Sequence, residues 1–235
     1  MATFNGERFI NTQVRSILNQ LGPDDELIIS DDHSTDATID ITRKLDDPRI
    51  KIIVNSGQNG PVSNFQNALL HCKGEIIFLS DQDDIWMNDR MKEALDMHQN
   101  GYDLVACNCL LIDENDNRIS QEPYFNAQHP LKRSFMMNWY ENSFYGCCMS
   151  FNRKVLNYSL PFPGNIVMHD VWIGMLAKAK FNCGYLEKCL VLYRRHPDTA
   201  SFGKWKGGKQ VKVSNWWRIK TRLMLLYHVL KRLIF

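Results

Sequence analysis

Apolar and polar positions alternate along the first half of the chain in two periods, which predict a series of strands and helices. Short runs rich in Ile, Val and Leu are typical of buried strands, whereas apolar residues that recur every three or four positions are typical of helices. The expected strands cover residues 26–30, 50–54, 75–80 and 103–109. The expected helices between them cover residues 7–20, 35–47, 61–72 and 88–100. This alternation predicts an α/β fold with a central, mostly parallel sheet and helices on both faces.

Local signals mark two of the helix starts and leave the first strand short. Ser34-Thr35-Asp36 predicts a cap for the second helix, and Pro61 stands where the third helix should begin. Residues 1–4 can supply only the end of a first strand. Either that strand is short or its beginning precedes this sequence.

The regular alternation ends near residue 110, where polar loops surround a short apolar segment, YGCCMSF. The pattern predicts a strand at this segment. Further along the chain it predicts a helix over 169–180, a strand over 189–194, a basic linker over 203–214 and an amphipathic C-terminal helix. We therefore expect one α/β domain over residues 1–202, followed by a linker and helix over 203–235.

Composition and cysteine usage exclude several classes of protein. Hydrophobic residues make up 44% of the 235 residues, which is ample for a packed core. No apolar run is long enough to span a membrane, and the N-terminus lacks the pattern of a secretory signal. The seven cysteines form no spaced CxxC pairs, so reduced thiols in a cytoplasmic protein are expected.

The net charge of +2 hides an asymmetry, because residues 1–198 hold 19 bases against 26 acids and the rest of the chain holds nine bases and no acid. A basic, Trp-containing helix suits the anionic surface of a membrane. Packing of this helix on the main domain or in a homodimer is the alternative. Nucleic acid is excluded as a partner, since the acidic body would repel it.

Polar residues gather where the predicted strands end. In an open parallel sheet, ligands bind beyond the carboxyl ends of the strands. Thr3 and Asn5 follow the first strand, Asp31 and Asp32 the second, and the segment DQDD at 81–84 the fourth. A carboxylate in such a place can accept hydrogen bonds from a base or a ribose.

The segment DQDD admits two interpretations. Asp81 and Asp83 can face the same side of an extended segment, so that one contacts sugar hydroxyls while the other binds Mg²⁺ or Mn²⁺. A solvated turn is the alternative, since an isolated pair of carboxylates is a weak signal. The position after a buried strand, with Asp32 at the neighbouring strand end, favours the metal site.

Asp170 lies at the start of the helix predicted over 169–180, and it too has two interpretations. It could stabilise the positive end of the helix dipole, or it could act as a general base toward an acceptor hydroxyl. The histidines at 33, 71, 98, 129 and 228 share no spacing and are expected to be surface or packing residues.

Four segments in order, MATFNGERFI, IISDDHSTDAT, GEIIFLSDQDDIW and HDVW, resemble the family-two inverting glycosyltransferases of the GT-A fold. LSDQDDIW and YRRH most resemble the rhamnosyltransferase-like branch, which builds bacterial surface polysaccharides. The resemblance covers about residues 1–200. It departs from the family at His169, where the commoner residue is Glu, and at the short first strand, which puts the contacts of Thr3 and Asn5 in question.

The resemblance implies a role for each matching position. Thr3, Asn5 and Asp32 would line the nucleotide pocket, with Asp32 at the edge of the uracil or thymine. Asp81 would contact the ribose or the sugar, and Asp83 would bind the metal that bridges the diphosphate. Asp170 would be the general base, and His196 would approach the metal or the diphosphate.

The function so implied is a metal-dependent, inverting hexosyl transfer from a UDP- or dTDP-sugar, with rhamnose as one candidate sugar. The acceptor would be a saccharide or a lipid-linked saccharide at the inner face of the plasma membrane. A sugar nucleotidyltransferase is one alternative, although the Gly-rich loop that it needs after the first strand is missing. A non-catalytic binding protein of the same fold is the other.

Overall fold

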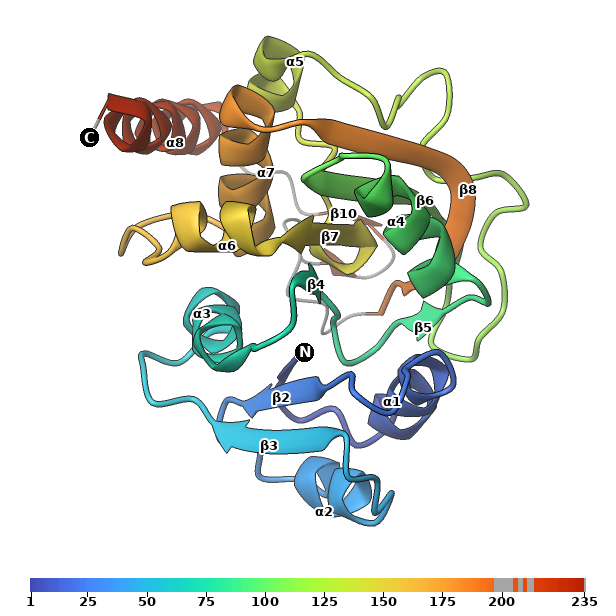
Figure 1. Cartoon of the computed structure of the whole chain (residues 1–235). Helices are drawn as coiled ribbons and strands as arrows, with labels where there is room; N and C mark the ends of the chain where they lie inside the picture. The colour runs from blue at the N-terminus through green and yellow to red at the C-terminus, as the bar shows by residue number, and fades with distance from the viewer. Residues whose placement is uncertain (197–204, 207–208, 211–213, 235) are drawn as a thin grey trace.

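The computed structural model describes residues 1–196, 205–206, 209–210 and 214–234, and Figure 1 shows their arrangement. The fold is α/β, as predicted, with a parallel sheet, flanking helices and a C-terminal helix. Of the basic linker expected over 203–214, residues 203–204, 207–208 and 211–213 lie outside the described residues. No helix among those described is long and apolar enough to cross a membrane.

The first part of the chain forms a parallel sheet with the order β1-β2-β3. Its strands are β1 (Ala2–Thr3), β2 (Leu27–Asp31) and β3 (Ile50–Val54). The helices that connect them and follow them are α1 (Ile10–Leu18), α2 (Thr38–Arg43) and α3 (Pro61–His71). Every residue of β2 is buried, which explains its unbroken apolar run.

The second sheet has the order β4-β7-β6-β8-β5 and is mixed. Its strands are β4 (Ile76–Phe78), β5 (Ile85–Trp86), β6 (Leu104–Ile112), β7 (Met149–Asn152) and β8 (Cys183–Arg194). β6 and β8 are parallel, whereas β7 runs antiparallel to both β4 and β6. The mostly parallel sheet that the sequence predicts is therefore parallel in the first sheet and in the β6–β8 pair, and antiparallel at β7 and β5.

The remaining helices cover the second sheet or extend from it (Figure 1). They are α4 (Arg90–Gln99), α5 (Phe135–Tyr140), the single turn η1 (Gly146–Cys148), α6 (Arg153–Ser159), α7 (His169–Lys180) and α8 (Asn215–Ile234). A short hairpin, β9 (Trp205–Lys206) with β10 (Lys209–Gln210), lies in the region expected to be a linker.

The predicted cap of the second helix is corrected by the structure. The helix starts at Thr38, and the backbone N–H of Thr38 donates to Asp36 Oδ1 at 3.0 Å. Ser34 instead donates its hydroxyl to Asp31 and accepts the N–H of Asn5. Pro61 does open α3, as expected.

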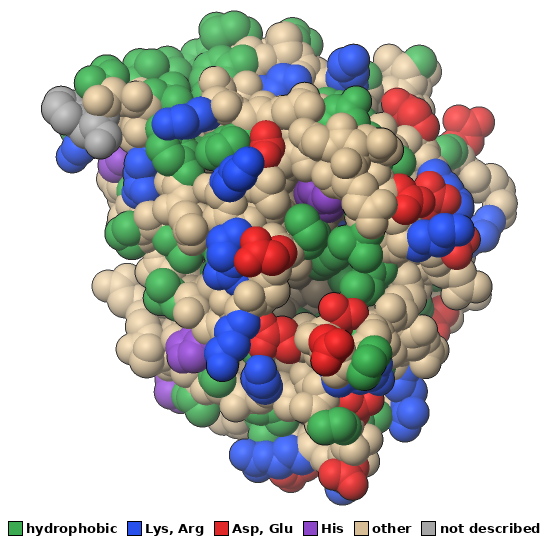
Figure 2. All heavy atoms as spheres, in the orientation of Figure 1, with side chains coloured by type: hydrophobic (Ala, Val, Ile, Leu, Met, Phe, Trp, Pro, Cys, Tyr) green, Lys and Arg blue, Asp and Glu red, His purple; other side chains and the backbone are tan. Residues whose placement is uncertain are grey.

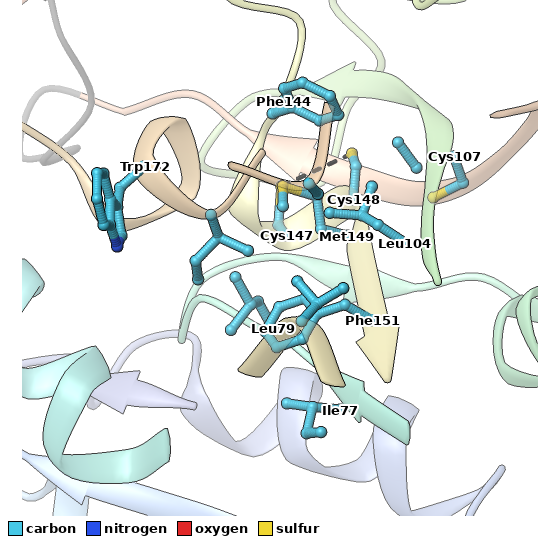
Figure 3. Packing of buried hydrophobic residues seen from close by; sticks show 14 of the residues in the cluster. Ile77, Leu79, Leu104, Cys107, Phe144, Cys147, Cys148, Met149, Phe151 and Trp172 are labelled. Carbon is cyan, nitrogen blue, oxygen red and sulfur yellow. Dashed lines mark hydrogen bonds between the residues drawn. The ribbon is translucent and has the colours of Figure 1, made fainter. Parts of the chain in front are cut away.

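The main core lies between the second sheet and α7. Figure 3 shows Leu79, Leu104, Met149 and Phe151 converging there, with Trp172 of α7 at one side. All seven cysteines are free thiols, and Cys147 and Cys148 are buried in this core with their sulfurs 3.9 Å apart. This agrees with the expectation of reduced thiols that serve packing.

The two sheets do not join along their whole facing edges. β1 is short, and the outer edge of β4 pairs with no named strand in the described chain. A cavity of about 670 Å³ lies between the sheets, and its lining includes Leu27 and Ile28 of β2 and Ile76 and Phe78 of β4. The N-terminus lies beside this cavity, between β2 and β4 (Figure 1). The two residues of β1 therefore leave most of the facing edges of β2 and β4 without a strand partner in the described chain.

Candidate active site

The ends of β1 and β2 hold the first group of predicted site residues in a fixed network. Thr3 is buried and donates to Asp31 Oδ1 at 3.1 Å. Asn5 accepts the N–H of Thr35 at 2.9 Å and has φ of 46°, in the left-handed region that Asn tolerates. Both residues therefore shape the turn after β1.

Asp32 is buried at the end of β2 and organises the loop after β3. One of its oxygens accepts from Asn55 Nδ2 at 2.7 Å, and the other accepts the N–H of Gly60 at 2.6 Å. Gly60 has φ of 120°, a conformation that L side chains rarely adopt. Asp32 thus places the loop over 55–60 beside the end of β2, where a planar base could lie.

The acidic segment after β4 is clamped to the end of β1 by Gln82. This side chain donates to Phe4 O at 2.9 Å and accepts the N–H of Phe4 at 2.8 Å, as a strand partner would. A Cβ at Gly6 would lie 2.3 Å from Gln82 Oε1, so this close approach requires a glycine. The clamp brings the acidic segment against the turn that contains Asn5.

Asp83 and His196 meet at the centre of this edge. His196 Nε2 lies 2.7 Å from Asp83 Oδ2, although the two residues are far apart in the sequence. Both side chains are mostly buried, with exposed fractions of 11% for His196 and 13% for Asp83. The residues that the family resemblance assigned to the metal are therefore in contact.

Arg194 holds this geometry, and the sequence analysis did not single it out. Its side chain is buried, and it donates to the carbonyl oxygens of Asp83 and Asp113 and forms an ion pair with Asp116 at 2.6 Å. Its backbone N–H donates to Asp84 Oδ1 at 2.9 Å. The only sequence signal for this role is its place in YRRH, directly before a histidine.

Burial and mutual repulsion perturb the carboxylates of the acidic segment. Burial, with the charges of Asp83 and Asp170, raises the pKa of Asp81 to about 7. Burial and the neighbouring carboxylates raise the pKa of Asp84 well above its ordinary value. Asp84 Oδ2 is buried without a hydrogen-bond partner. The described residues therefore do not fully offset the mutual repulsion of these carboxylates.

The donor set fits a divalent cation. Carboxylate oxygens and an imidazole nitrogen are ligands that Mg²⁺ or Mn²⁺ accepts. Ligand atoms of Asp81, Asp84 and Cys147 lie within 4.8 Å of one another, in a group that does not include Asp83. The Cys147 thiol has a pKa raised well above its ordinary value by its hydrogen bond to Cys148 and by burial, so it is a poor ligand for a hard cation.

Asp170 lies in the first turn of α7, as predicted, and faces the same edge. Its Oδ2 accepts the N–H of Gly146 at 3.0 Å, and its Oδ1 accepts the N–H of Val171 at 2.7 Å. Burial raises its pKa to about 6, against the lowering effect of these two hydrogen bonds. Its charge also acts on Asp81, which places it within electrostatic reach of the acidic segment.

The structure thus arranges the predicted site residues in three groups. Thr3, Asn5 and Asp32 shape the turns after the first two strands, Asp83 pairs with His196, and Asp170 reaches Asp81 from α7. Trp86 is buried after the acidic segment, with the Arg90 guanidinium carbon 4.9 Å from its ring centroid. Gln82 and Arg194 were missed because their contacts join segments that no local pattern connects.

Comparison with known proteins shows that the chain is similar to sugar-transferring enzymes. The model of "Glycosyl transferase family 2" matches residues 1–159. A GalNAc(5)-diNAcBac-PP-undecaprenol beta-1,3-glucosyltransferase from Campylobacter jejuni is 27% identical over 89% of this chain and 68% of its own length. The dTDP-rhamnosyl transferase RfbG of Shigella flexneri is 29% identical over 83% of this chain and 71% of its own length.

Solved structures share the fold at lower identity. S. aureus TarS 1–349 in complex with UDP has a TM-score of 0.66 at 20% identity, over 83% of this chain and 59% of that one. The mannosyltransferase PcManGT of Pyrobaculum calidifontis, in complex with GDP-Man and Mn²⁺, has a TM-score of 0.59 at 18% identity, over 82% and 55% of the two chains. This chain therefore spans less than two thirds of either crystallised protein.

Proposed function

The chain belongs to glycosyl transferase family 2, and on that premise we propose a metal-dependent, inverting transfer of a hexosyl group from a nucleoside diphosphate sugar. The observation that carries the proposal is the contact of Asp83 with His196 beside Asp81, with Asp170 in electrostatic reach. It combines a cation site with a separate carboxylate that is suited to proton transfer.

In this proposal Asp83 binds the divalent cation and His196 is its second protein ligand. When bound, Mg²⁺ or Mn²⁺ neutralises charge on the departing diphosphate. Asp81 contacts hydroxyls of the ribose or the sugar. Thr3, Asn5 and Asp32 hold the nucleotide, with Asp32 and the loop over 55–60 beside the base. The Mn²⁺ named with the mannosyltransferase PcManGT supports this choice of metal.

Asp170 is the proposed general base. A base for an acceptor hydroxyl should be ionised at neutral pH and still have a raised proton affinity. A pKa of about 6, caused by burial and moderated by two N–H donors, meets both needs. Asp170 would take the proton as the hydroxyl attacks the anomeric carbon from the side opposite the leaving diphosphate, which inverts the configuration.

The donor and the acceptor are proposed from the relatives. Their names include a glucosyltransferase that acts on an undecaprenol-linked saccharide and a dTDP-rhamnosyl transferase. We infer an acceptor saccharide on a lipid diphosphate in the synthesis of a bacterial surface glycan, with a UDP- or dTDP-sugar as donor. Rhamnose, which LSDQDDIW and YRRH favour by resemblance, is one candidate beside glucose.

A membrane-facing role for the C-terminal helix fits this acceptor. α8 packs on the rest of the protein through Leu225 and Val229, which are buried. Most of its other large apolar residues are exposed, among them Trp216 at 72%, and α5 adds exposed Met136 and Tyr140. Trp139 Nε1 of α5 donates to Arg222 O of α8, so the two helices form one surface.

Figure 2 shows basic and apolar side chains together on the upper left of the molecule, where Figure 1 places α8 and α5. The described part of α8 holds no acidic residue. We propose that this surface, formed by α5 and α8, rests on the anionic inner face of the plasma membrane. Residues 1–202 would then be the catalytic domain and residues 203–235 its membrane-facing extension, rather than a dimer contact.

A thermal-shift panel of nucleotide sugars, each with and without Mn²⁺, tests the proposed function. We expect one UDP- or dTDP-sugar to raise the melting temperature only when Mn²⁺ is present, because a ligand that binds the folded state stabilises that state. A panel in which no nucleotide sugar shifts the melting temperature with Mn²⁺ would contradict the proposal. A shift by nucleoside triphosphates alone would favour a sugar nucleotidyltransferase.

A further inference from the structure

The side chains at the end of β8 point alternately to two faces, as successive residues of an extended chain do. Arg194 and His196 contact the acidic segment, through the carbonyl oxygen and the carboxylate of Asp83. Arg195 points elsewhere, with its guanidinium carbon 4.6 Å from the ring centroid of Tyr193 and 6.0 Å from that of Tyr124. Arg195 is therefore turned away from the proposed metal site.

Arg195 lies against a group of aromatic rings, here called the tyrosine cluster, which consists of Tyr124, Tyr145 and Tyr193. The Tyr124 and Tyr145 rings meet edge to face with centroids 5.4 Å apart, and their hydroxyl oxygens are 2.8 Å apart. The Tyr145 and Tyr193 centroids are 5.8 Å apart. Tyr124 and Tyr145 are half-buried, so part of each residue is exposed.

The tyrosine cluster is held in place by β6. The N–H of Tyr124 donates to Cys109 O at 2.9 Å. Asn108, which is buried, accepts the N–H of Phe125 at 3.0 Å and donates to its carbonyl oxygen at 2.7 Å. Asn108, a polar residue in a buried strand, thus fixes the segment around Phe125 in the long connection between β6 and β7. A binding site needs such support from a rigid element.

The tyrosine cluster also adjoins the proposed base. Tyr145 directly precedes Gly146, whose N–H donates to Asp170 Oδ2 at 3.0 Å. Asp170 therefore adjoins two neighbourhoods: it lies within electrostatic reach of the acidic segment, and it accepts a hydrogen bond from the residue that follows Tyr145. A general base must contact the acceptor hydroxyl, so the neighbourhood that lacks the metal ligands is the place for an acceptor.

The guanidinium of Arg195 has only aromatic contacts in the part of the chain that the structure describes. It has no hydrogen-bond acceptor and no carboxylate partner there, whereas the guanidinium of Arg194 next to it contacts Asp83, Asp113 and Asp116. It is half-buried and stacked on aromatic faces. A partly desolvated guanidinium with free donors matches phosphate, which it can bind through two parallel hydrogen bonds.

We propose that Arg195 and the tyrosine cluster form the acceptor subsite, in which the guanidinium binds a phosphate of the acceptor and Tyr124 and Tyr145 contact the adjoining sugar. Tyrosine suits this role because its ring covers apolar sugar faces while its hydroxyl meets sugar hydroxyls. The inference rests on the proposed function, since the phosphate that Arg195 would bind belongs to the lipid diphosphate of the acceptor proposed there.

Binding experiments without donor or metal test the subsite. The probes are inorganic pyrophosphate, octyl N-acetylglucosaminyl diphosphate and the neutral octyl N-acetylglucosaminide, titrated in EDTA and followed by calorimetry. The variants are Arg195→Gln, Arg195→Lys and, as a control, Arg118→Gln at an exposed arginine. UDP with Mn²⁺ is titrated into each variant to report on the donor site.

We expect Arg195→Gln to weaken both phosphate probes by roughly ten- to a hundredfold, the usual effect of losing hydrogen bonds to a charged group. Arg195→Lys should lose less, and Arg118→Gln should bind like the unaltered protein. The neutral glycoside and UDP with Mn²⁺ should be unaffected by all three changes. Equal binding of the phosphate probes to Arg195→Gln and the unaltered protein would overturn the proposal.

Two further outcomes separate the subsite from the proposed function. If Arg195→Gln weakens UDP with Mn²⁺ as much as it weakens pyrophosphate, Arg195 serves the donor and the acceptor subsite is wrong. If phosphate binding depends on Arg195 but the protein transfers sugar to no lipid diphosphate acceptor, the subsite stands and the proposed function fails.

Discussion

Asp170 shows how one residue obtains the properties of a base from its surroundings. The sequence places it at the start of a helix, where a carboxylate could equally serve the helix dipole. The structure adds burial, the N–H of Gly146 and the nearby charge of Asp81. Its pKa of about 6 is the balance of burial, which raises it, and of backbone hydrogen bonds such as that from Gly146, which lower it, and neither can be predicted from the local pattern.

This pKa predicts the pH dependence of the reaction. The carboxylate must be ionised to accept a proton, so kcat/KM should fall about tenfold per pH unit below a pH of about 6 and level off above it. The measurement is kcat/KM at a series of pH values between 4.5 and 8. The midpoint of the fall should lie within about one pH unit of the pKa of Asp170. The residual activity of Asp170→Asn should lack this dependence. A flat profile for the unaltered protein through the same range would contradict the role of Asp170.

At the scale of elements, the sequence predicted the strand and helix order through β4 and the bounds of α7, because local periodicity determines both, but it missed the two-residue strand β5. It did not predict that β7 would run antiparallel between β4 and β6, since pairing partners depend on distant segments. The same limit applies to the site. Asp32, Asp83 and Asp170 stood out by position, but Gln82, Arg194 and the tyrosine cluster depend on contacts between remote segments.

The cavity between β2 and β4 leads to a prediction about stability. The facing edges of these strands have room between them and no strand partner along most of their length. A short extension of alternating Val and Thr, fused before Met1, should continue β1, pair with both edges and fill the cavity. We expect the melting temperature to rise by about 5 °C or more.

The control for this extension is a Gly-Ser segment of equal length, which can reach the same place but has little tendency to form a strand. Differential scanning calorimetry of the three proteins makes the comparison. Equal melting temperatures for the two extensions would show that the cavity does not accept a strand.

At the scale of the whole molecule, an acidic body and a basic C-terminal helix belong to one chain. The sequence left open whether the helix packs on the domain or meets a membrane, and the structure shows a buried side and an exposed side of α8. Leu225 and Val229 are buried against the domain, while Trp216, Tyr227 and Leu230 are exposed. Periodicity alone could not show which side of a helix with bases on several faces would be covered.

Vesicle binding tests the membrane surface. Lys220→Glu on the exposed side of α8 should reduce co-sedimentation with phosphatidylglycerol vesicles by roughly tenfold or more, since each base near an anionic surface contributes about 1 kcal/mol. Lys44→Glu, at an exposed position just after α2, is the matched control and should change binding little. Equal losses for the two variants would mean that overall charge, and not this surface, governs the binding.

The central claim is that Asp83 serves the donor through a metal while Asp170 serves the chemical step. Titration of UDP in Mn²⁺, together with sugar transfer by the same preparations, tests this division directly with Asp83→Ala and Asp170→Asn. We expect Asp83→Ala to lose metal-dependent UDP binding, and Asp170→Asn to keep UDP binding while its transfer falls by roughly a hundredfold or more. Unchanged metal-dependent binding in Asp83→Ala, or undiminished transfer by Asp170→Asn, would contradict the account.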